Sequence, residues 1–284
     1  MISLTGLSRY VEAVNMVHLL HTIIDHDQIY IPLYSHVRYP GCIGLRGYVV
    51  LTGASSGIGY YLARILCSEG YRVLGIGRNH EALEGLRREY SGCFDYLVLD
   101  LSDPRSIDEI VDYVSREYGQ LDVLINNAGY AIHKPLLEHS PREIEDIVLV
   151  NTVRPIQLVI RLVEYMKPGS VVVNVITSGV YVRLYSLPSY GLSKAALHYA
   201  SIMLDKELKK RGIRLVKVYP GPVKTRFFER AGAKTPSKLI LDPEKVAKAI
   251  YKAIRGRRKT LYLPQVLWIL PIITKYPLPI NYDP

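Results

Sequence analysis

Tyr190 and Lys194 are the two residues of this 284-residue chain whose types and spacing most directly suggest chemistry. The intervening sequence predicts a helix, in which a separation of four places both side chains on one face, about one turn apart. A phenol titrates near pKa ~10, but a fixed ammonium beside it favours the phenolate and lowers that pKa. The pair therefore predicts a general acid–base tuned toward neutral pH. The spacing alone is weak evidence, since the chain contains 23 tyrosines.

Two hydroxyl groups precede this pair in the segment Thr177-Ser178-Gly179, directly after a predicted strand. A hydroxyl at the end of a strand can donate to a substrate carbonyl oxygen and stabilise the charge that develops there. Both Ser178 and Thr177 are candidates from their position alone.

A glycine-rich turn, Thr52-Gly53-Ala54-Ser55-Ser56-Gly57-Ile58-Gly59, lies between a predicted strand and a predicted helix. Glycines permit the tight turn and a close backbone approach to a pyrophosphate, and the helix N-terminus offers free N–H groups to phosphates. After the second predicted strand, Gly77-Arg78-Asn79 contains no carboxylate to accept from a ribose 2′-hydroxyl. Arg78 can instead pair with a 2′-phosphate, so the sequence favours NADP over NAD.

The elements that would position these residues alternate between strands and helices. Apolar runs, typical of strands covered on both faces, occupy residues 48–51, 72–76, 96–99, 123–125, 171–176, 214–218 and 260–263. Ser140-Pro141-Arg142-Glu143 forms a capping box, and Asp103-Pro104 and Asp242-Pro243 predict two further helix starts. The pattern predicts an α/β doubly wound domain of about seven parallel strands flanked by helices on both faces.

The spacing TGxxxGxG resembles the short-chain dehydrogenase/reductase family, in its compact single-domain branch. Asp100-Leu101, Asn126-Asn127-Ala128-Gly129, the Tyr-x-x-x-Lys pair and Pro220-Gly221-Pro222-Val223-Lys224-Thr225 follow in that family's order, and the resemblance covers roughly residues 45–263. It implies a Rossmann-type fold, a homodimer or homotetramer, and a small-molecule carbonyl or alcohol substrate. It also implies cofactor contacts from Gly53, Ser55, Ser56, Gly57, Ile58, Gly59, Arg78, Asp100, Leu101, Asn127, Ala128, Gly129, Tyr190, Lys194, Pro220, Gly221, Val223 and Thr225.

The resemblance also assigns catalytic roles. Its serine lies at about the distance that separates Ser178 from Tyr190, so Ser178 is the first candidate to bind the substrate oxygen, with Thr177 as the alternative. Tyr190 would donate the proton, and Lys194 would position the ribose and, with the positive nicotinamide, lower the pKa of the tyrosine. Asn151 would anchor a relay water beside the lysine, or it is a helix asparagine bonded to the backbone.

These roles imply an NADP-dependent oxidoreductase that transfers a hydride between the nicotinamide and a carbonyl or secondary alcohol. Ketone or aldehyde reduction is expected, including reduction of apolar or acyl-type substrates. The alternative is a catalytically silent dinucleotide-binding regulatory protein. A nucleic-acid binder is suggested only by charge, and the chain has no recognisable DNA- or RNA-reading motif.

Three parts are expected along the chain: an N-terminal extension (1–45), the catalytic domain (46–263) and an apolar tail (264–284). The tail could form a lid, a subunit interface or a membrane contact. Residues 226–241 should form the substrate loop, with Phe227 and Phe228 as its apolar cover. His18, His21, Asp25 and His26 have a spacing that suits a metal, but the family chemistry needs none, so we expect no metal.

Composition sets the remaining limits. The chain carries a net charge of +10, and residues 205–284 alone carry +13, which could attract nucleic acid, acidic lipid or anionic substrates. The longest apolar stretch, 261–280, contains four prolines and a lysine, so no membrane-spanning helix is expected. Three cysteines without a CxxC pair argue against a zinc finger and a disulfide framework and favour a cytoplasmic location, with peripheral membrane contact left open.

Overall fold

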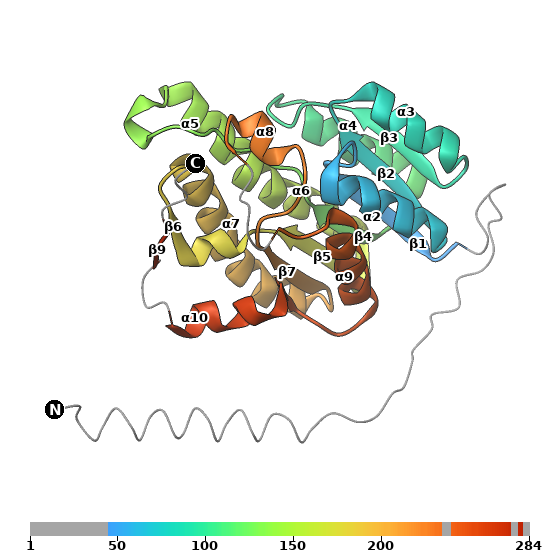
Figure 1. The fold of residues 1–284 in the computed structure, drawn as a ribbon. Helices are drawn as coiled ribbons and strands as arrows, with labels where there is room; N and C mark the ends of the chain where they lie inside the picture. The colour runs from blue at the N-terminus through green and yellow to red at the C-terminus, as the bar shows by residue number, and fades with distance from the viewer. Residues whose placement is uncertain (1–44, 235–239, 274–277, 281–284) are drawn as a thin grey trace, which may run out of the picture. The chain divides into compact units, whose positions relative to one another are not determined.

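The computed structural model describes residues 45–234, 240–273 and 278–280. Its main feature is a parallel seven-stranded sheet in the order β3-β2-β1-β4-β5-β7-β8 (Figure 1). These strands are β1 (Gly47–Thr52), β2 (Tyr71–Gly77), β3 (Phe94–Val98), β4 (Leu121–Asn126), β5 (Met166–Val175), β7 (Arg214–Pro220) and β8 (Thr260–Leu263). All seven predicted strands are confirmed. The short pair of β6 (Val182–Leu184) with β9 (Leu278–Ile280) was not predicted, because three residues are too few to show a strand pattern.

Helices cover both faces of this sheet. They are α2 (Gly57–Ser68), α3 (His80–Glu89), α4 (Ser106–Tyr113), α5 (Pro141–Val148), α6 (Arg154–Leu162), α7 (Pro188–Lys210), α8 (Phe227–Ala231), α9 (Pro243–Arg255) and α10 (Leu270–Ile273). Shorter turns are π-helical at η1 (Val114–Tyr118) and η3 (Leu149–Val153), and 3₁₀ at η2 (Leu136–Glu138), η4 (Val163–Tyr165), η5 (Ser178–Tyr181) and η6 (Gln265–Ile269).

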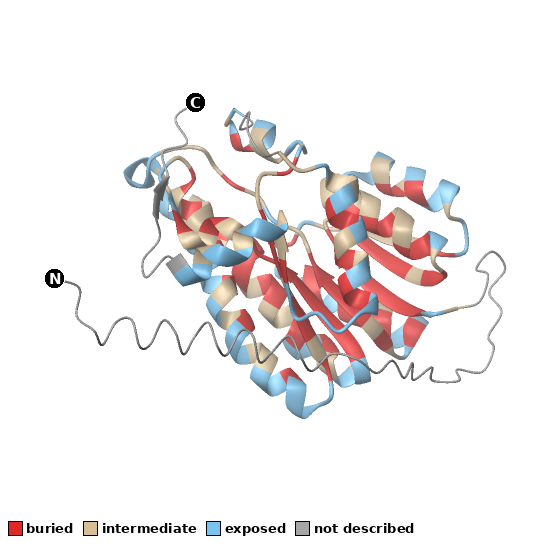
Figure 2. Cartoon of the chain, turned by 60° about the horizontal axis from the view of Figure 1, so that its bottom comes forward, coloured by how far each residue is buried: buried red, intermediate tan, exposed pale blue. Residues whose placement is uncertain are grey.

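Two hydrophobic cores lie on opposite sides of β1, whose six residues are all buried. Val49 and Leu51 pack with residues of α2, α3 and α9, whereas Tyr48 and Val50 pack with residues of α4, α6 and α7. Figure 2 shows the buried strands between helices whose outer faces are exposed. The predicted doubly wound fold is therefore confirmed.

Strand order places a crevice at a defined point of the sheet. The chain runs outward from β1 to β2 and β3, and then returns to form β4 on the other side of β1. In open parallel sheets, ligands bind beyond the carboxyl ends of the strands where the order reverses in this way. The glycine-rich turn follows β1, and Asn127 follows β4, so both lie at this switch point.

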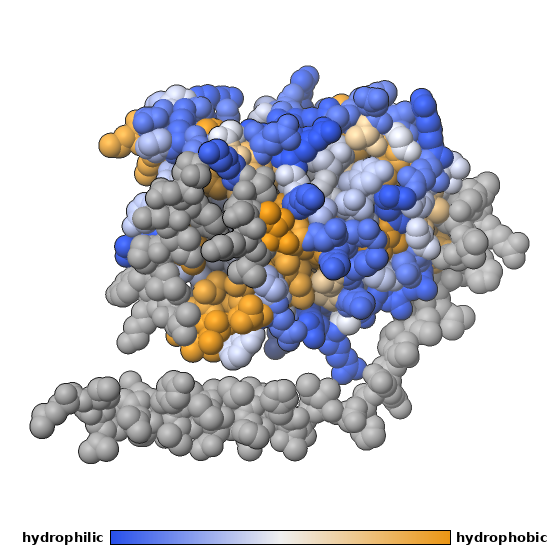
Figure 3. Space-filling view, in the orientation of Figure 1, coloured by the Kyte–Doolittle hydropathy of each residue, from blue (hydrophilic) through white to orange (hydrophobic). Residues whose placement is uncertain are grey.

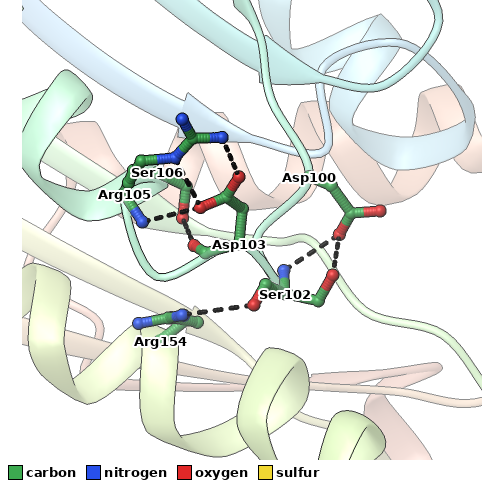
Figure 4. Close-up of polar contacts among 6 residues, drawn as sticks. All are labelled: Asp100, Ser102, Asp103, Arg105, Ser106 and Arg154. Atoms are coloured by element: carbon green, nitrogen blue, oxygen red, sulfur yellow. Dashed lines mark hydrogen bonds and ion pairs between the residues drawn. The ribbon is translucent and has the colours of Figure 1, made fainter.

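Two of the three predicted helix starts are confirmed. Ser140 and Glu143 form a reciprocal capping box at α5, and Asp242 accepts from two main-chain N–H groups at the start of α9. The start predicted at Asp103 is wrong, because α4 begins at Ser106. The Asp103 carboxylate instead accepts from the main chain and the guanidinium of Arg105, which closes a turn before the helix (Figure 4).

Cysteine pairing departs from expectation. Cys67 is free and buried, whereas Cys93 is disulfide-bonded. One bonded cysteine does not make a disulfide framework, but a bonded Cys93 does not fit the reducing compartment expected from the cysteine count, so the cytoplasmic location stays a prediction without that argument.

The predicted N-terminal extension lies outside the described residues except for residue 45, as do its histidines. Within the described residues, no group of three or more His, Cys, Asp or Glu side chains is arranged to hold a metal ion. No helix in the described part of the chain is long and apolar enough to cross a membrane. Figure 3 shows an apolar patch at the lower edge of the surface, where Figure 1 places α10.

Candidate active site

A cavity of about 1790 Å³ opens beyond the carboxyl ends of the central strands. Ordinary small-molecule sites measure roughly 300–1,000 Å³, so this volume suits a large ligand together with a second, smaller one. Every residue for which we predicted a cofactor contact lines it, apart from Gly59. Ser178 also lines it, whereas Asn151 does not.

The glycine-rich turn has the backbone shape that a phosphate cradle requires. Gly53 and Gly57 adopt positive φ values of 73° and 56°, which side-chain-bearing residues rarely adopt. A Cβ at Gly59 would collide with the main-chain oxygen of Gly53, so Gly59 serves the close packing of α2 rather than ligand contact. Ser56 makes no side-chain cap at the start of α2, and the first turn contains no acidic residue. The leading N–H groups of α2 are therefore suited to an anionic ligand, and the residues fit a dinucleotide.

Asn127 shapes this turn from the neighbouring strand. Its side-chain amide donates to the main-chain oxygen of Thr52 at 3.0 Å, and its main-chain N–H donates to the Thr52 hydroxyl at 3.0 Å. The amide of Asn127 is thus used within the protein, where it ties the end of β4 to the end of β1.

Arg78 and Asp100 lie at the outer end of the cavity and form an ion pair at 3.3 Å. Burial opposes ionisation of Asp100, but hydrogen bonds from the N–H and hydroxyl of Ser102 and the nearby Arg78 outweigh it, and the pKa of Asp100 is lowered. Both side chains are largely exposed, so the pair itself is weak and leaves Arg78 accessible to a stronger anion.

Arg154 is a residue of this region that sequence reasoning missed. Its guanidinium is buried under the turn after β3, where it donates to the main-chain oxygens of Leu101 at 2.7 Å and Ser102 at 3.4 Å (Figure 4). It thereby fixes the turn that carries Asp100. No sequence signal pointed to it, because it stands alone in a helix that is far from this turn in the chain.

Tyr190 and Lys194 project from one face of α7 into the inner end of the cavity. Lys194 is 3% exposed, and its Nζ donates to the main-chain oxygen of Val175 at 2.8 Å. Burial lowers the pKa of Lys194 to about 8. Burial also raises the pKa of Tyr190 to about 12, against a smaller lowering by the Thr177 hydroxyl.

The predicted lowering of the Tyr190 pKa by Lys194 is therefore not found among the chain's own groups. The ammonium is directed to the Val175 carbonyl, and desolvation of the phenol dominates.

The two candidate hydroxyls lie side by side, and both donate to the same main-chain oxygen, that of Pro220. Ser178 Oγ donates to the main-chain oxygen of Pro220 at 3.2 Å. Thr177 Oγ1 lies 3.4 Å from the same oxygen, accepts from the N–H of Gly179, and interacts with the Tyr190 phenol. Contact with the phenol thus distinguishes Thr177 from Ser178, and the roles of both hydroxyls stay predictions.

Asn151 is fully buried in the π-helical turn η3, behind the cavity wall. Its Oδ1 accepts from the N–H of Tyr130 at 3.0 Å, and its Nδ2 donates to the Tyr130 oxygen and to Ser193 Oγ, each at 2.9 Å. The side chain is therefore bonded to backbone, as one reading predicted, but across elements rather than within its own helix. A Cβ at Gly129 would lie 3.0 Å from Asn151 Oδ1 and 3.3 Å from Lys194 Nζ, so Gly129 leaves both groups room.

The inner end of the cavity has apolar walls. They come from the segment before α7, from α8, and from the segment after β8, through Leu184, Leu187, Phe227, Phe228, Leu267 and Leu270. The ring centroids of Phe227 and Tyr190 are 5.1 Å apart, and His133 N–H donates to the Ala231 oxygen at 2.8 Å, which attaches α8 across the cavity. The predicted apolar cover by Phe227 and Phe228 is present, although residues 235–239 of the predicted substrate loop lie outside the described residues.

Comparison with known proteins agrees with the family resemblance of the motifs. A family model described as short chain dehydrogenase matches residues 47–236. An uncharacterized oxidoreductase of Staphylococcus aureus (strain MW2) is 30% identical over 210 residues, which cover 72% of this chain and 89% of that protein.

Solved structures share the fold. A short-chain dehydrogenase from Sphingobium yanoikuyae in complex with NADPH superposes with a TM-score of 0.72 at 24% identity, covering 78% of this chain and 90% of that one. An alcohol dehydrogenase from the archaeon Thermococcus sibiricus, complexed with 5-hydroxy-NADP, gives a TM-score of 0.66 at 26% identity, covering 76% and 95%. With its motifs, its sheet order and a family model matched over most of its length, this chain belongs to the short-chain dehydrogenase family.

Proposed function

We propose that the protein is an NADP-dependent reductase that transfers a hydride from the nicotinamide to an apolar ketone or aldehyde. In the reverse direction it would oxidise the corresponding alcohol. The observation that carries the proposal is the convergence of Tyr190, Lys194 and Thr177 at the apolar end of a cavity whose other end is a glycine-rich turn. The bound nicotinamide supplies the hydride.

The chain's own groups have distinct tasks in this reaction. With its pKa raised to about 12, Tyr190 is protonated at neutral pH and is ready to donate a proton to the substrate oxygen. Thr177 lies where a second hydroxyl can donate to the same oxygen and stabilise its developing charge. Lys194, with a pKa of about 8, is mostly charged at neutral pH and favours the phenolate that remains after proton transfer.

Preference for NADP is supported by Arg78, which follows β2 and lines the outer end of the cavity. Positions 77 to 79 contain no carboxylate that could accept from a ribose 2′-hydroxyl. The ion pair of Arg78 with Asp100 is exposed and so is weak enough for a 2′-phosphate to replace it. Structural neighbours are described in complex with NADPH, an NADP analogue and NAD, so the neighbours alone do not select between the two dinucleotides.

A homo-oligomer is also proposed, as the resemblance implied. An exposed apolar stripe on α7 supports it, with Leu192, Tyr199, Ile202 and Met203 exposed at helical spacing, and Ile160 of α6 is exposed as well. Light scattering of the full chain tests this directly. A molecular mass equal to that of one chain would contradict the proposed homo-oligomer.

The proposed activity is tested with a panel of ketones and aldehydes of increasing chain length, monitored by the absorbance of the reduced cofactor. Turnover with NADPH that improves with chain length is expected, because the substrate end of the cavity is apolar. Tight NADPH binding without turnover on any member would contradict an enzyme and favour a silent dinucleotide-binding regulator.

A further inference from the structure

The segment from Gln265 to Ile272 presents apolar side chains in two directions. Leu267 and Leu270 line the cavity at its substrate end. Val266, Trp268 and Ile272 instead face outward and are 65%, 51% and 65% exposed. Ile269 of the same segment is also exposed, and Figure 3 shows an apolar patch at the lower edge of the surface, where Figure 1 places α10. One short segment therefore separates the substrate end of the cavity from an exposed apolar surface.

Cations lie directly beside this patch. Arg257, Arg258 and Lys259 are all exposed in the loop that joins α9 to β8. Arg258 and Lys259 line a shallow hollow together with Trp268, so the basic loop and this tryptophan border the same part of the surface. Among the salt bridges of the described residues, none involves these three cations. We call Arg257, Arg258, Lys259, Val266, Trp268, Ile269 and Ile272 the basic apolar face.

We propose that the basic apolar face binds an anionic lipid surface. Exposed apolar side chains with a tryptophan among them insert at the level of lipid headgroups, and flanking Arg and Lys are attracted to acidic headgroups. A second copy of the chain fits this face poorly, because a two-fold contact would bring each basic loop toward its own copy. Charge complementarity therefore selects the lipid surface over a self-contact.

Docking in this way would give the site a source of substrate. With Leu267 and Leu270 on the cavity side and the bilayer on the other, an apolar carbonyl compound dissolved in lipid reaches the cavity across a single segment. Delivery of substrate from lipid deepens the proposed function and rests on it, whereas the proposed binding to lipid does not depend on that function.

The tryptophan provides a direct test, since Trp268 is the only one in the chain. Vesicles of phosphatidylcholine with phosphatidylserine, added to the full-length protein, should shift its tryptophan fluorescence to the blue and shield it from a soluble quencher. Vesicles of phosphatidylcholine alone should do so much less, and salt should reverse the effect. An unchanged spectrum with anionic vesicles would overturn the proposal.

Co-sedimentation with the same vesicles tests the two components separately. Replacing Arg257, Arg258 and Lys259 by Gln should weaken binding at least about tenfold, and the pair Trp268→Ser with Ile272→Ser should do the same. The matched controls are Lys206, Lys209 and Lys210→Gln, which remove the same charge from α7, and Tyr185→Ser, which removes another exposed aromatic. Equal losses in control and test variants would contradict a specific face. The proposal would also be overturned if the unmodified protein did not bind vesicles and the Trp268→Ser, Ile272→Ser protein had a lower molecular mass in solution. That result would assign the basic apolar face to a subunit contact.

Activity then separates this inference from the proposed function. The Trp268→Ser, Ile272→Ser protein should reduce a short water-soluble ketone at the normal rate but lose activity on a long-chain ketone supplied in anionic vesicles. Equal activity on both would refute delivery from lipid. Absence of turnover on any ketone would refute the proposed function, while the fluorescence result would still decide lipid binding.

Discussion

Asn151 donates a 2.9 Å hydrogen bond to the hydroxyl of Ser193, the residue that precedes Lys194, and so connects the π-helical turn η3 to α7. Its remaining hydrogen bonds are both to the main chain of Tyr130, the residue directly after the motif Asn126-Asn127-Ala128-Gly129. One buried amide thus joins three segments around the lysine.

Replacing Asn151 by Ala should destabilise the protein, because it leaves the N–H and oxygen of Tyr130 without their partner in a buried site. Each group left unsatisfied costs about 1–3 kcal/mol in the free energy of unfolding. Denaturant unfolding measures the change. Asn79→Ala, which removes the exposed cap of α3, is the control and should cost only about 1 kcal/mol. Equal losses for the two variants would show that the Asn151 network is unimportant.

Thr177→Val and Ser178→Ala distinguish the two hydroxyls. Thr177 faces the Tyr190 phenol, so its loss should lower kcat by about 10²–10³, as for an oxyanion-binding group. Ser178→Ala should have a much smaller effect, and Thr177→Ser should retain most of the activity. Steady-state kinetics on one ketone provides the comparison, and the reverse order of effects would restore Ser178 as the catalytic hydroxyl.

Arg78 should determine the choice of dinucleotide. Removing its charge-assisted bonds to a 2′-phosphate, worth about 1.5–3 kcal/mol, should lower kcat/KM for NADPH by about tenfold to a hundredfold. Arg78→Asp should also raise the preference for NADH, because a carboxylate there can accept from the ribose hydroxyl. Arg88→Asp, on the exposed side of α3, is the charge-matched control. An unchanged NADPH-to-NADH ratio in Arg78→Asp would disprove the assignment.

Much of this site was accessible from the sequence because its parts are local patterns. The glycine-rich turn, the four-residue spacing of Tyr190 and Lys194 and the capping box at Ser140 each depend on neighbours in the chain, and continuous apolar runs revealed the seven strands. These features place the phosphate cradle and the acid–base pair without knowledge of packing.

The features that were missed depend on contacts between distant segments. Arg154 contacts a turn 52 and 53 residues away, and no local pattern indicates this. The choice between Thr177 and Ser178 depends on how the end of β5 twists relative to α7. A change in the length of the loop between them moves the hydroxyl that faces α7 by one residue. The raised pKa of Tyr190 depends on burial of the phenol by distant segments, and Lys194, although at the expected spacing, is directed to the Val175 oxygen.

The pH dependence of carbonyl reduction follows from Lys194. Burial lowers its pKa to about 8, so the ammonium is present below that pH and is lost as pH rises through it. Tyr190 stays protonated over the same range because its pKa is about 12. The value of kcat/KM for the ketone should therefore be constant near neutral pH and fall above about pH 8. Lys194→Arg, which stays charged, should be slower but should lack this fall, whereas a fall at the same pH in both proteins would assign the titration to another group.

Tyr190→Phe tests the central claim most directly, because it removes one oxygen from the half-buried phenol in the cavity and leaves the ring that packs on Phe227. Hydride transfer from NADPH to a ketone should fall about 10²–10⁴-fold, as expected for loss of a general acid, while NADPH binding measured by fluorescence should be nearly unchanged. Tyr185→Phe, an exposed tyrosine five positions away, is the control and should behave as the unmodified protein. Undiminished turnover in Tyr190→Phe would contradict the account.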